Sequence, residues 1–264
     1  MSSSSSRRIV RVGSGGRDER DDLLPTEEPV EFRLVGVPIA VLMRTPGQDE
    51  DLGRGFALTE GIIFRPSELV EVRALPGEDG AGRYELIMAD GVDIDPEQFR
   101  RNFYATSSCG VCGKASIDSV RIAAPPSPTG PIVAAARLGE YMETMRQSQS
   151  GFSESGGLHA AAAFDGTGKM LALREDIGRH NAMDKLVGHL SMQRWPLEEL
   201  TITLSGRVSF ELVQKAAVAG LSVLAGVSAA SSLAVDLADE LGLTVAGFVR
   251  PGGFNIYTHS HRIV

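Results

Sequence analysis

The feature that most constrains the fold is a regular alternation of segments over the last quarter of the chain. Short apolar segments that are typical of buried strands alternate with longer segments of helical composition: 201–205, 208–219, 221–227, 231–241 and 243–249. Gly220 and Gly242 stand where helix C-caps occur. Strands that alternate with helices predict a parallel or mixed sheet covered by helices, that is, an α/β fold.

The same alternation of predicted strands and helices begins soon after Gly130. Residues 138–147 are predicted to be helical and residues 148–157 to form a polar loop. A tight turn at 165–168 joins two predicted strands, and an amphipathic helix follows, with apolar residues at relative positions 0, 3, 4 and 7. These strands and the helix residues are 158–164, 169–174, Met183, Leu186, Val187 and Leu190.

The chain of 264 residues divides by composition into three parts. Residues 1–28 are rich in Ser, Arg, Asp and Glu, and we predict a disordered tail there. Residues 29–128 are predicted to form a smaller β-rich domain that ends in a cysteine-containing loop, and residues 129–264 form the α/β domain. Within the middle part, the predicted elements are a hairpin over 30–35 and 37–44, a helix from Asp49 to near Gly61, and strands over 68–74, 84–88 and 119–123.

Charge and hydropathy exclude several classes of function. Lys and Arg total 26 and Asp and Glu total 34, so the net charge is −8, which argues against sequence-independent binding to nucleic acid. The uncharged run 216–235 is interrupted by glycines and serines, and we interpret it as a helix end, a buried strand and a helix start, not as a membrane span. The N-terminus lacks an apolar segment of the kind found in signal peptides. We therefore expect a cytoplasmic protein.

The only two cysteines, Cys109 and Cys112, form a CxxC pair. Two cysteines are too few for a disulfide framework, and such a pair is typical of redox, metal-binding or catalytic sites. Gly110 and Gly113 make the loop small and flexible, and Lys114 favours the thiolate. The loop suits disulfide exchange, zinc ligation or transport of a persulfide sulfur, with a structural cysteine pair as the alternative.

Zinc requires further ligands that the sequence does not supply in a known pattern. Zinc deaminases use His-x-Glu followed by Pro-Cys-x-x-Cys. Here Ala161 stands two positions after His159, Ser108 precedes Cys109, and the cysteine pair comes before the histidine. The residues after Cys112 do not predict the helix that a thioredoxin-type pair requires. We expect no metal site.

Three clusters at predicted junctions of strands with helices or turns suit an anion, because helix N-termini and the carboxyl ends of strands bind phosphates. The alternatives are a core histidine at 159 and a solvated helix start capped by Asp176. A strand that runs into Pro251-Gly252-Gly253 is by itself a plain hairpin turn. The candidate residues in the three clusters are Gly156, Gly157, His159, Arg179, His180, Ser205 and Arg207.

Several separated stretches in one order together resemble the FdhD/NarQ family of sulfur carrier proteins needed for active formate dehydrogenase. The resemblance covers roughly residues 28–262. The stretches that carry it are Glu28-Pro29-Val30, Thr59-Glu60-Gly61-Ile62-Ile63, Ser107-Ser108-Cys109-Gly110-Val111-Cys112-Gly113, Gly156-Gly157-Leu158-His159-Ala160-Ala161, Arg174-Glu175-Asp176-Ile177-Gly178-Arg179-His180-Asn181, Ser205-Gly206-Arg207-Val208-Ser209-Phe210-Glu211 and Phe254-Asn255-Ile256-Tyr257.

This resemblance implies a fold and an activity. The fold of residues 129–264 is expected to be similar to that of cytidine deaminases, without their zinc. A cysteine desulfurase is expected to donate sulfur to Cys109, with Cys112 assisting, and the persulfide sulfur then passes to the molybdenum (or tungsten) bis(guanine dinucleotide) cofactor before its insertion into formate dehydrogenase. A homodimer is also expected. The family's cofactor-binding stretch falls on Phe248, Val249, Arg250, Pro251, Gly252 and Gly253.

The sequence therefore predicts a sulfurtransferase. Two other hypotheses use the same exposed thiolate: a cofactor-binding chaperone that carries no sulfur, and a dithiol oxidoreductase with a reversible disulfide between Cys109 and Cys112.

Overall fold

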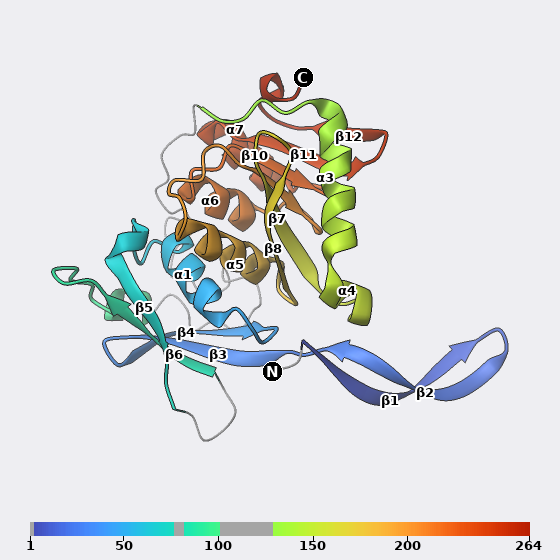
Figure 1. Cartoon of the computed structure of the whole chain (residues 1–264), viewed down its shortest axis with the longest axis horizontal. Helices are drawn as coiled ribbons and strands as arrows, with labels where there is room; N and C mark the ends of the chain where they lie inside the picture. Colours follow the sequence, from blue (N-terminus) through green and yellow to red (C-terminus); the bar gives the residue numbers. More distant parts are fainter. Residues whose placement is uncertain (1–2, 77–81, 101–128) are drawn as a thin grey trace.

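The computed structural model describes residues 3–76, 82–100 and 129–264, and the largest sheet in this part of the chain has six strands (Figure 1). Its strand order is β12-β11-β10-β9-β7-β8. The strands β9, β10 and β11 are parallel, whereas β7 is antiparallel to both of its neighbours and β12 is antiparallel to β11. The predicted mixed α/β class is thus confirmed. The strands are β7 (His159–Phe164), β8 (Met170–Asp176), β9 (Thr201–Leu204), β10 (Val223–Gly226), β11 (Thr244–Arg250) and β12 (Gly253–Ile256).

The strand directions create one edge that matters below. Because β8, β9, β10 and β11 run the same way, their carboxyl ends meet at one edge of the sheet, where the antiparallel β7 begins. We call this the carboxyl edge. In open α/β sheets this is the place where ligands bind.

Helices cover both faces of the sheet, and the alternation of side chains along each strand explains why. Along β7, Ala161 and Ala163 pack on the side of α5, α6 and α7, whereas Ala160 and Ala162 pack on the side of α3. All four are fully or almost fully buried, so both faces of the strand are apolar. The helices are α3 (Ala135–Ser148), α5 (Arg179–Ser191), α6 (Phe210–Val218) and α7 (Ser232–Leu241).

A second, four-stranded sheet of order β4-β3-β6-β5 lies below this layer (Figure 1). The hairpin of β3 and β4 is confirmed, as is the following helix, α1. Phe32, Leu34 and Val72 from this sheet belong to the same buried cluster as Leu186 of α5 and Ile202 of β9, so one core runs through both sheets. The elements are β3 (Glu28–Leu34), β4 (Val37–Arg44), α1 (Asp49–Thr59), η1 (Pro66–Glu68), β5 (Leu69–Ala74), β6 (Gly82–Met88) and α2 (Glu97–Arg100), and η3 (Ser260–Arg262) lies near the C-terminus.

The two layers meet where α1 crosses α5 at very close range. A Cβ atom on Gly55 of α1 would overlap the carbonyl oxygen of Asp184, and one on Gly188 of α5 would overlap that of Asp51. Only glycine lets two helix backbones approach so closely. The crossing therefore depends on one glycine from each helix.

The prediction of a disordered tail over residues 1–28 is wrong. Residues 4–25 form an antiparallel hairpin of β1 (Ser4–Gly13) and β2 (Gly16–Pro25) with a two-residue turn at Ser14 and Gly15. The composition is polar, but the pairing sets Arg8 opposite Asp21 and Arg7 opposite Asp22, so the charges favour the ribbon.

Two smaller differences concern loops. Residues 148–157, predicted to be a polar loop, contain the short helix α4 (Ser150–Ser155), whose first N–H groups, on Gly151 and Phe152, donate to the Glu175 carboxylate. The turn at 251–252 leads into β12, which the sequence did not predict. The predicted strand over 119–123 lies outside the described residues. None of the helices in the described ranges has the length and apolar character needed to cross a membrane.

Replacement of Gly55 by Ala tests the helix crossing. In an unconstrained helix this substitution is stabilising by about 1 kcal/mol. Here we expect a loss of about 1–3 kcal/mol in the free energy of unfolding, because the new methyl group has no space against the backbone of α5. Chemical denaturation measures the change, with Gly166→Ala as a control, since a Cβ at Gly166 meets nothing within 4 Å. Unchanged or increased stability of Gly55→Ala would refute the close crossing.

Candidate functional site

The carboxyl edge collects most of the residues that the sequence singled out. Predicted candidates lie in the connection before β7, in the connection after β8 and in the connection after β9. The stretch 248–253 lies at the end of β11 and reaches the same edge. The candidates that lie at this edge are Gly156, Gly157, His159, Arg179, His180, Ser205, Arg207, Phe248, Val249, Arg250, Pro251, Gly252 and Gly253.

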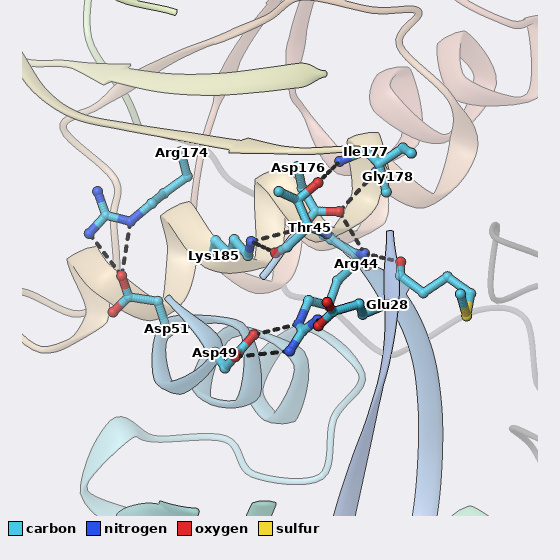
Figure 2. Close-up of polar contacts among 12 residues, drawn as sticks. Glu28, Arg44, Thr45, Asp49, Asp51, Arg174, Asp176, Ile177, Gly178 and Lys185 are labelled. Atoms are coloured by element: carbon cyan, nitrogen blue, oxygen red, sulfur yellow. Dashed lines mark hydrogen bonds and ion pairs between the residues drawn. The ribbon is translucent and has the colours of Figure 1, made fainter. Parts of the chain in front are cut away.

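The position of the β8–α5 turn is set by the buried carboxylate of Asp176 (Figure 2). One oxygen accepts the backbone N–H of Thr45 at 3.1 Å and forms an ion pair with Lys185 at 2.7 Å. The other accepts the N–H of Gly178 at 2.9 Å and the Asn181 side-chain amide at 3.0 Å. The alternative of a solvated Asp176 cap is therefore wrong, since the carboxylate is fully buried and the N-cap residue of α5 is Gly178.

The same contacts tie the turn to the N-terminal layer. The Lys185 ammonium also donates to the carbonyl oxygen of Thr45 at 2.8 Å, and the Thr45 hydroxyl accepts the N–H of Ile177 at 3.1 Å. Nearby, the Asp51 carboxylate accepts two hydrogen bonds from Arg174, at 2.8 and 2.9 Å (Figure 2). The turn that precedes Arg179 and His180 is therefore fixed by residues of α5 and also by Thr45 of the N-terminal layer.

His159 and Ser205 lie next to each other at the centre of the edge. The Ser205 hydroxyl accepts the N–H of Ala160 at 2.8 Å and lies 3.4 Å from Nδ1 of His159. A Cβ on Gly206 would lie 3.3 Å from that Nδ1 and 3.8 Å from Cδ of Arg179. The structure thus brings together three clusters that are separate in the sequence.

Basic side chains surround His159. Burial lowers the pKa of His159 below its ordinary value, and the nearby Arg179, His180 and Arg207 lower it further. The Nε atom of Arg179 is buried and has no hydrogen-bond partner among the described residues. A buried donor without a partner costs free energy unless a ligand satisfies it. The arrangement suits an anion such as a phosphate.

His180 is held by two residues at the start of α6. Its Nε2 lies 3.2 Å from the Ser209 hydroxyl and 3.7 Å from the Glu211 carboxylate. Burial alone would raise the pKa of Glu211, but the hydrogen bonds from His180, from its own backbone N–H and from Ser209 lower it to about 2. Glu211 was not among the predicted site residues, although it ends one of the stretches that carry the family resemblance and is the acidic residue in the first turn of α6.

The residues at the end of β11 differ in whether they are exposed at the carboxyl edge. Phe248 is half exposed and has a positive φ of 54°, and its N–H donates to the carbonyl oxygen of Ser228. The Arg250 guanidinium donates to the carbonyl oxygens of Val227 and Val249. The Val249 side chain is fully buried beside α3, so it does not face a ligand. Residues 251–253 are exposed and form the turn into β12.

Gly156 and Gly157 have structural reasons for being glycine. Gly156 ends α4 in the left-handed conformation, with a φ of 70°. A Cβ on Gly157 would lie 2.7 Å from the ring of Pro25 at the base of the hairpin. Sequence reasoning missed Ser228, in the β10–α7 loop, whose backbone meets both Gly206 and Phe248.

Cys109 and Cys112 lie outside the described residues. Within the ranges that the structure describes, no group of three or more His, Cys, Asp and Glu residues is arranged to hold a metal ion. Among the described residues, the candidate site is therefore the carboxyl edge with its arginines.

Removal of either partner of the Asp176–Lys185 pair should destabilise the protein strongly. We expect Lys185→Met to lower the free energy of unfolding by about 3–5 kcal/mol, because the Asp176 carboxylate would remain buried without its counter-ion. The double variant Asp176→Asn/Lys185→Met should lose less than the sum of the two single variants. The exposed pair of Glu143 and Arg146 provides the control, and Arg146→Met should change stability little. Strictly additive losses would contradict a coupled pair.

Comparison with known proteins identifies relatives of this chain in sequence and in fold. A model of the FdhD/NarQ family matches residues 25–264. The chain is 47% identical to the sulfur carrier protein FdhD of Mycolicibacterium paratuberculosis over 100% of both chains, and 46% identical to that of Streptomyces coelicolor over 97% of this chain and 94% of the relative. The crystal structure of a putative formate dehydrogenase accessory protein from Desulfotalea psychrophila shares the fold, with a TM-score of 0.77 and 21% identity over 99% of both chains. The match of the family model and the identity along the full chain show that this protein belongs to the FdhD/NarQ family.

Proposed function

We propose that the protein is a sulfur carrier for the maturation of formate dehydrogenase. The observation that carries the proposal is the full-length likeness to relatives named sulfur carrier proteins, in a chain whose only two cysteines form the CxxC pair of Cys109 and Cys112. The fold match to a protein described as a formate dehydrogenase accessory protein supports the same reading.

The sulfur step requires one nucleophilic thiolate. The thiolate of Cys109 attacks the outer sulfur of a persulfide on a cysteine desulfurase, a new S–S bond forms on Cys109, and the desulfurase cysteine leaves as a thiolate. The oxidation state of the transferred sulfur does not change, so no external oxidant is required. Cys112 lies three positions away, and attack of its thiolate on the inner sulfur of the Cys109 persulfide would release the outer sulfur as hydrosulfide and leave a disulfide between the two cysteines, which a thiol reductant then reduces before the next cycle.

The cargo in this proposal is the molybdenum or tungsten bis(guanine dinucleotide) cofactor, which is a substrate and carries pyrophosphate groups. The carboxyl edge fits such groups, because Arg179 presents a buried donor without a partner among the described residues and Arg207 is exposed beside it. Gly206 and the N-terminus of α5 allow close approach of a phosphate to the backbone. The exposed ring of Phe248 stands at the same edge, within reach of a nucleotide base.

Intact-protein mass spectrometry tests the sulfur step. After incubation with cysteine and a cysteine desulfurase, the native protein should gain the mass of one sulfur atom, and a reductant should remove it. Cys109→Ala should not gain it and should fail to support formate dehydrogenase maturation, although its thermal unfolding should be unchanged. Cys112→Ala is the matched control and should still accept sulfur. With an active desulfurase, absence of the gain in every form would exclude sulfur transport and favour a cofactor-binding chaperone.

Binding of a nucleoside diphosphate tests whether the carboxyl edge binds phosphate groups. Burial, Arg179, His180 and Arg207 hold the pKa of His159 low in the free protein, and a bound phosphate would raise it. Affinity for guanosine diphosphate should therefore be greatest below the pKa of His159 in the free protein and decline as pH rises through its pKa in the complex.

The measurement is calorimetric titration between pH 5 and 8, with NMR titration of the imidazole. Because the terminal phosphate of the probe titrates near pH 6, the comparison with His159→Gln isolates the contribution of the imidazole. His159→Gln should have a shallower pH dependence, and Arg179→Gln should weaken binding at every pH. An identical pH profile in the native protein and His159→Gln would rule out this coupling.

A further inference from the structure

Two histidines at the carboxyl edge each lie beside a serine, but through different ring nitrogens. The Nε2 atom of His180 lies 3.2 Å from the Ser209 hydroxyl, whereas the Nδ1 atom of His159 lies 3.4 Å from the Ser205 hydroxyl. A neutral imidazole carries one proton, so one ring nitrogen is a donor and the other is an acceptor. The further partners of each serine therefore decide which nitrogen of each ring can donate to a ligand.

At His180 the nitrogen beside the serine is the donor. The Ser209 hydroxyl donates to the Glu211 carboxylate, and an ionised carboxylate can only accept hydrogen bonds. The Nε2 atom of His180 also lies 3.7 Å from that carboxylate. Without a proton, Nε2 would face two acceptors, so in the neutral ring the proton is on Nε2 and Nδ1 is bare.

At His159 the nitrogen beside the serine is the acceptor. The Ser205 oxygen already accepts the backbone N–H of Ala160 at 2.8 Å, so the hydroxyl hydrogen is left to donate. Within the described ranges, the acceptor that this hydroxyl reaches is Nδ1 of His159. No carboxylate among the described residues forms a hydrogen bond with the His159 ring, so nothing there requires a proton on Nδ1, in contrast to the arrangement at His180.

The charges around His159 keep its ring neutral at pH 7 and above. Burial lowers the pKa of His159 below its ordinary value, and Arg179 and His180 of α5 lower it further. Arg207, in the connection from β9 to α6, acts in the same direction, and Asp176 at the end of β8 opposes them. Because the neutral ring carries one proton, the choice of nitrogen matters at this pH.

The position of the His159 ring leaves its second nitrogen for a ligand. A Cβ atom on Gly206 would lie 3.3 Å from Nδ1 and 3.4 Å from Cε1, so the ring fills the space that glycine leaves beside Ser205. In the part of the chain that the structure describes, Nε2 has no hydrogen-bond partner, and it is not one of the buried polar atoms that lack one. This atom is therefore accessible at the carboxyl edge.

We propose that Ser205 is a positioning residue: its hydroxyl donates to Nδ1 of His159 and thereby keeps the proton of the neutral imidazole on Nε2, as a hydrogen-bond donor to an anionic oxygen of the ligand. The inference rests on the proposed binding of phosphate groups at the carboxyl edge. In the opposite tautomer, the lone pair of Nε2 would repel the anion. Ser205 acts through His159 and does not itself contact the ligand.

Nitrogen NMR of the ligand-free protein at pH 8 tests the tautomer, because a protonated and a bare imidazole nitrogen have different chemical shifts. In the native protein, His159 should have its proton on Nε2 and a bare Nδ1, with the resonances assigned by their loss in His159→Gln. In Ser205→Ala, both nitrogens should have intermediate shifts, because both tautomers are populated. Ser205→Thr keeps the hydroxyl and should restore the native shifts. The matched control is Ser209→Ala, which removes the other serine and should leave the His159 tautomer unchanged.

Calorimetric titration with guanosine diphosphate separates positioning from a purely structural effect. At pH 8, Ser205→Ala should weaken binding about two- to fivefold, as expected for one hydrogen bond, and Ser205→Thr should bind as the native protein does. At pH 5, the bound phosphate favours the imidazolium, in which both nitrogens carry protons, so Ser205→Ala and the native protein should bind equally. Loss of the acceptor for the Ala160 N–H would instead weaken binding by the same factor at both pH values.

The outcomes separate this proposal from the one on which it rests. A proton on Nδ1 of His159 in the native protein, native His159 shifts in Ser205→Ala, or an equal loss of affinity at pH 5 and pH 8 would each overturn the role of Ser205. The first of these measurements needs no variant. If the native protein has the expected tautomer but does not bind guanosine diphosphate, phosphate binding at the edge is refuted, and the ligand-facing role of His159 is refuted with it.

Discussion

The buried carboxylate of Asp176 is the constraint on which the site depends. A buried carboxylate requires a counter-ion and several hydrogen bonds, and Asp176 obtains them from two regions about 130 residues apart in the sequence: Thr45 after β4, and Gly178, Asn181 and Lys185 in α5. If the N-terminal layer is not docked, the Asp176 carboxylate loses the hydrogen bond from Thr45. The carboxyl edge is therefore formed only when both layers are assembled, although its ligand-facing groups belong to one layer.

A second buried cluster strengthens the same interface. The Lys215 ammonium of α6 donates to Asp184, Glu60 and Thr59, at 3.0, 2.8 and 2.9 Å, where α1, α5 and α6 meet. Burial by itself lowers the pKa of Lys215, but the two carboxylates outweigh it and hold the pKa above its ordinary value. The lysine therefore stays charged, and the close crossing of Gly55 and Gly188 beside it leaves little freedom for the helices to slide.

The sequence allowed much of the fold to be predicted because the signals were local. Alternating apolar segments and the glycines at 220 and 242 indicated β9, α6, β10, α7 and β11. The N-terminal hairpin of β1 and β2 was missed because its stability lies in cross-strand charge pairs, such as Arg8 with Asp21, that composition does not show. The Asp176 and Lys215 clusters were missed for a related reason, since their members meet only after folding. Arg179 and Arg207 could be singled out from the sequence as candidates for an anion site, but their convergence with His159 and Gly206 depends on the strand order.

The balance of charge at the carboxyl edge explains how it can stay ready for an anion. Asp176 is neutralised by Lys185, and Glu211 is occupied by His180 and Ser209, so neither carboxylate is available to Arg179 or Arg207. In the part of the chain that the structure describes, neither arginine has an ion pair. A carboxylate beside Arg179 and Arg207 would compete with an incoming anion for their hydrogen bonds. The buried Nε of Arg179 is held by the α5 turn, so it would need little reorganisation to bind an anion. Asp176 and Glu211 thus fix the geometry of the edge without pairing with Arg179 or Arg207.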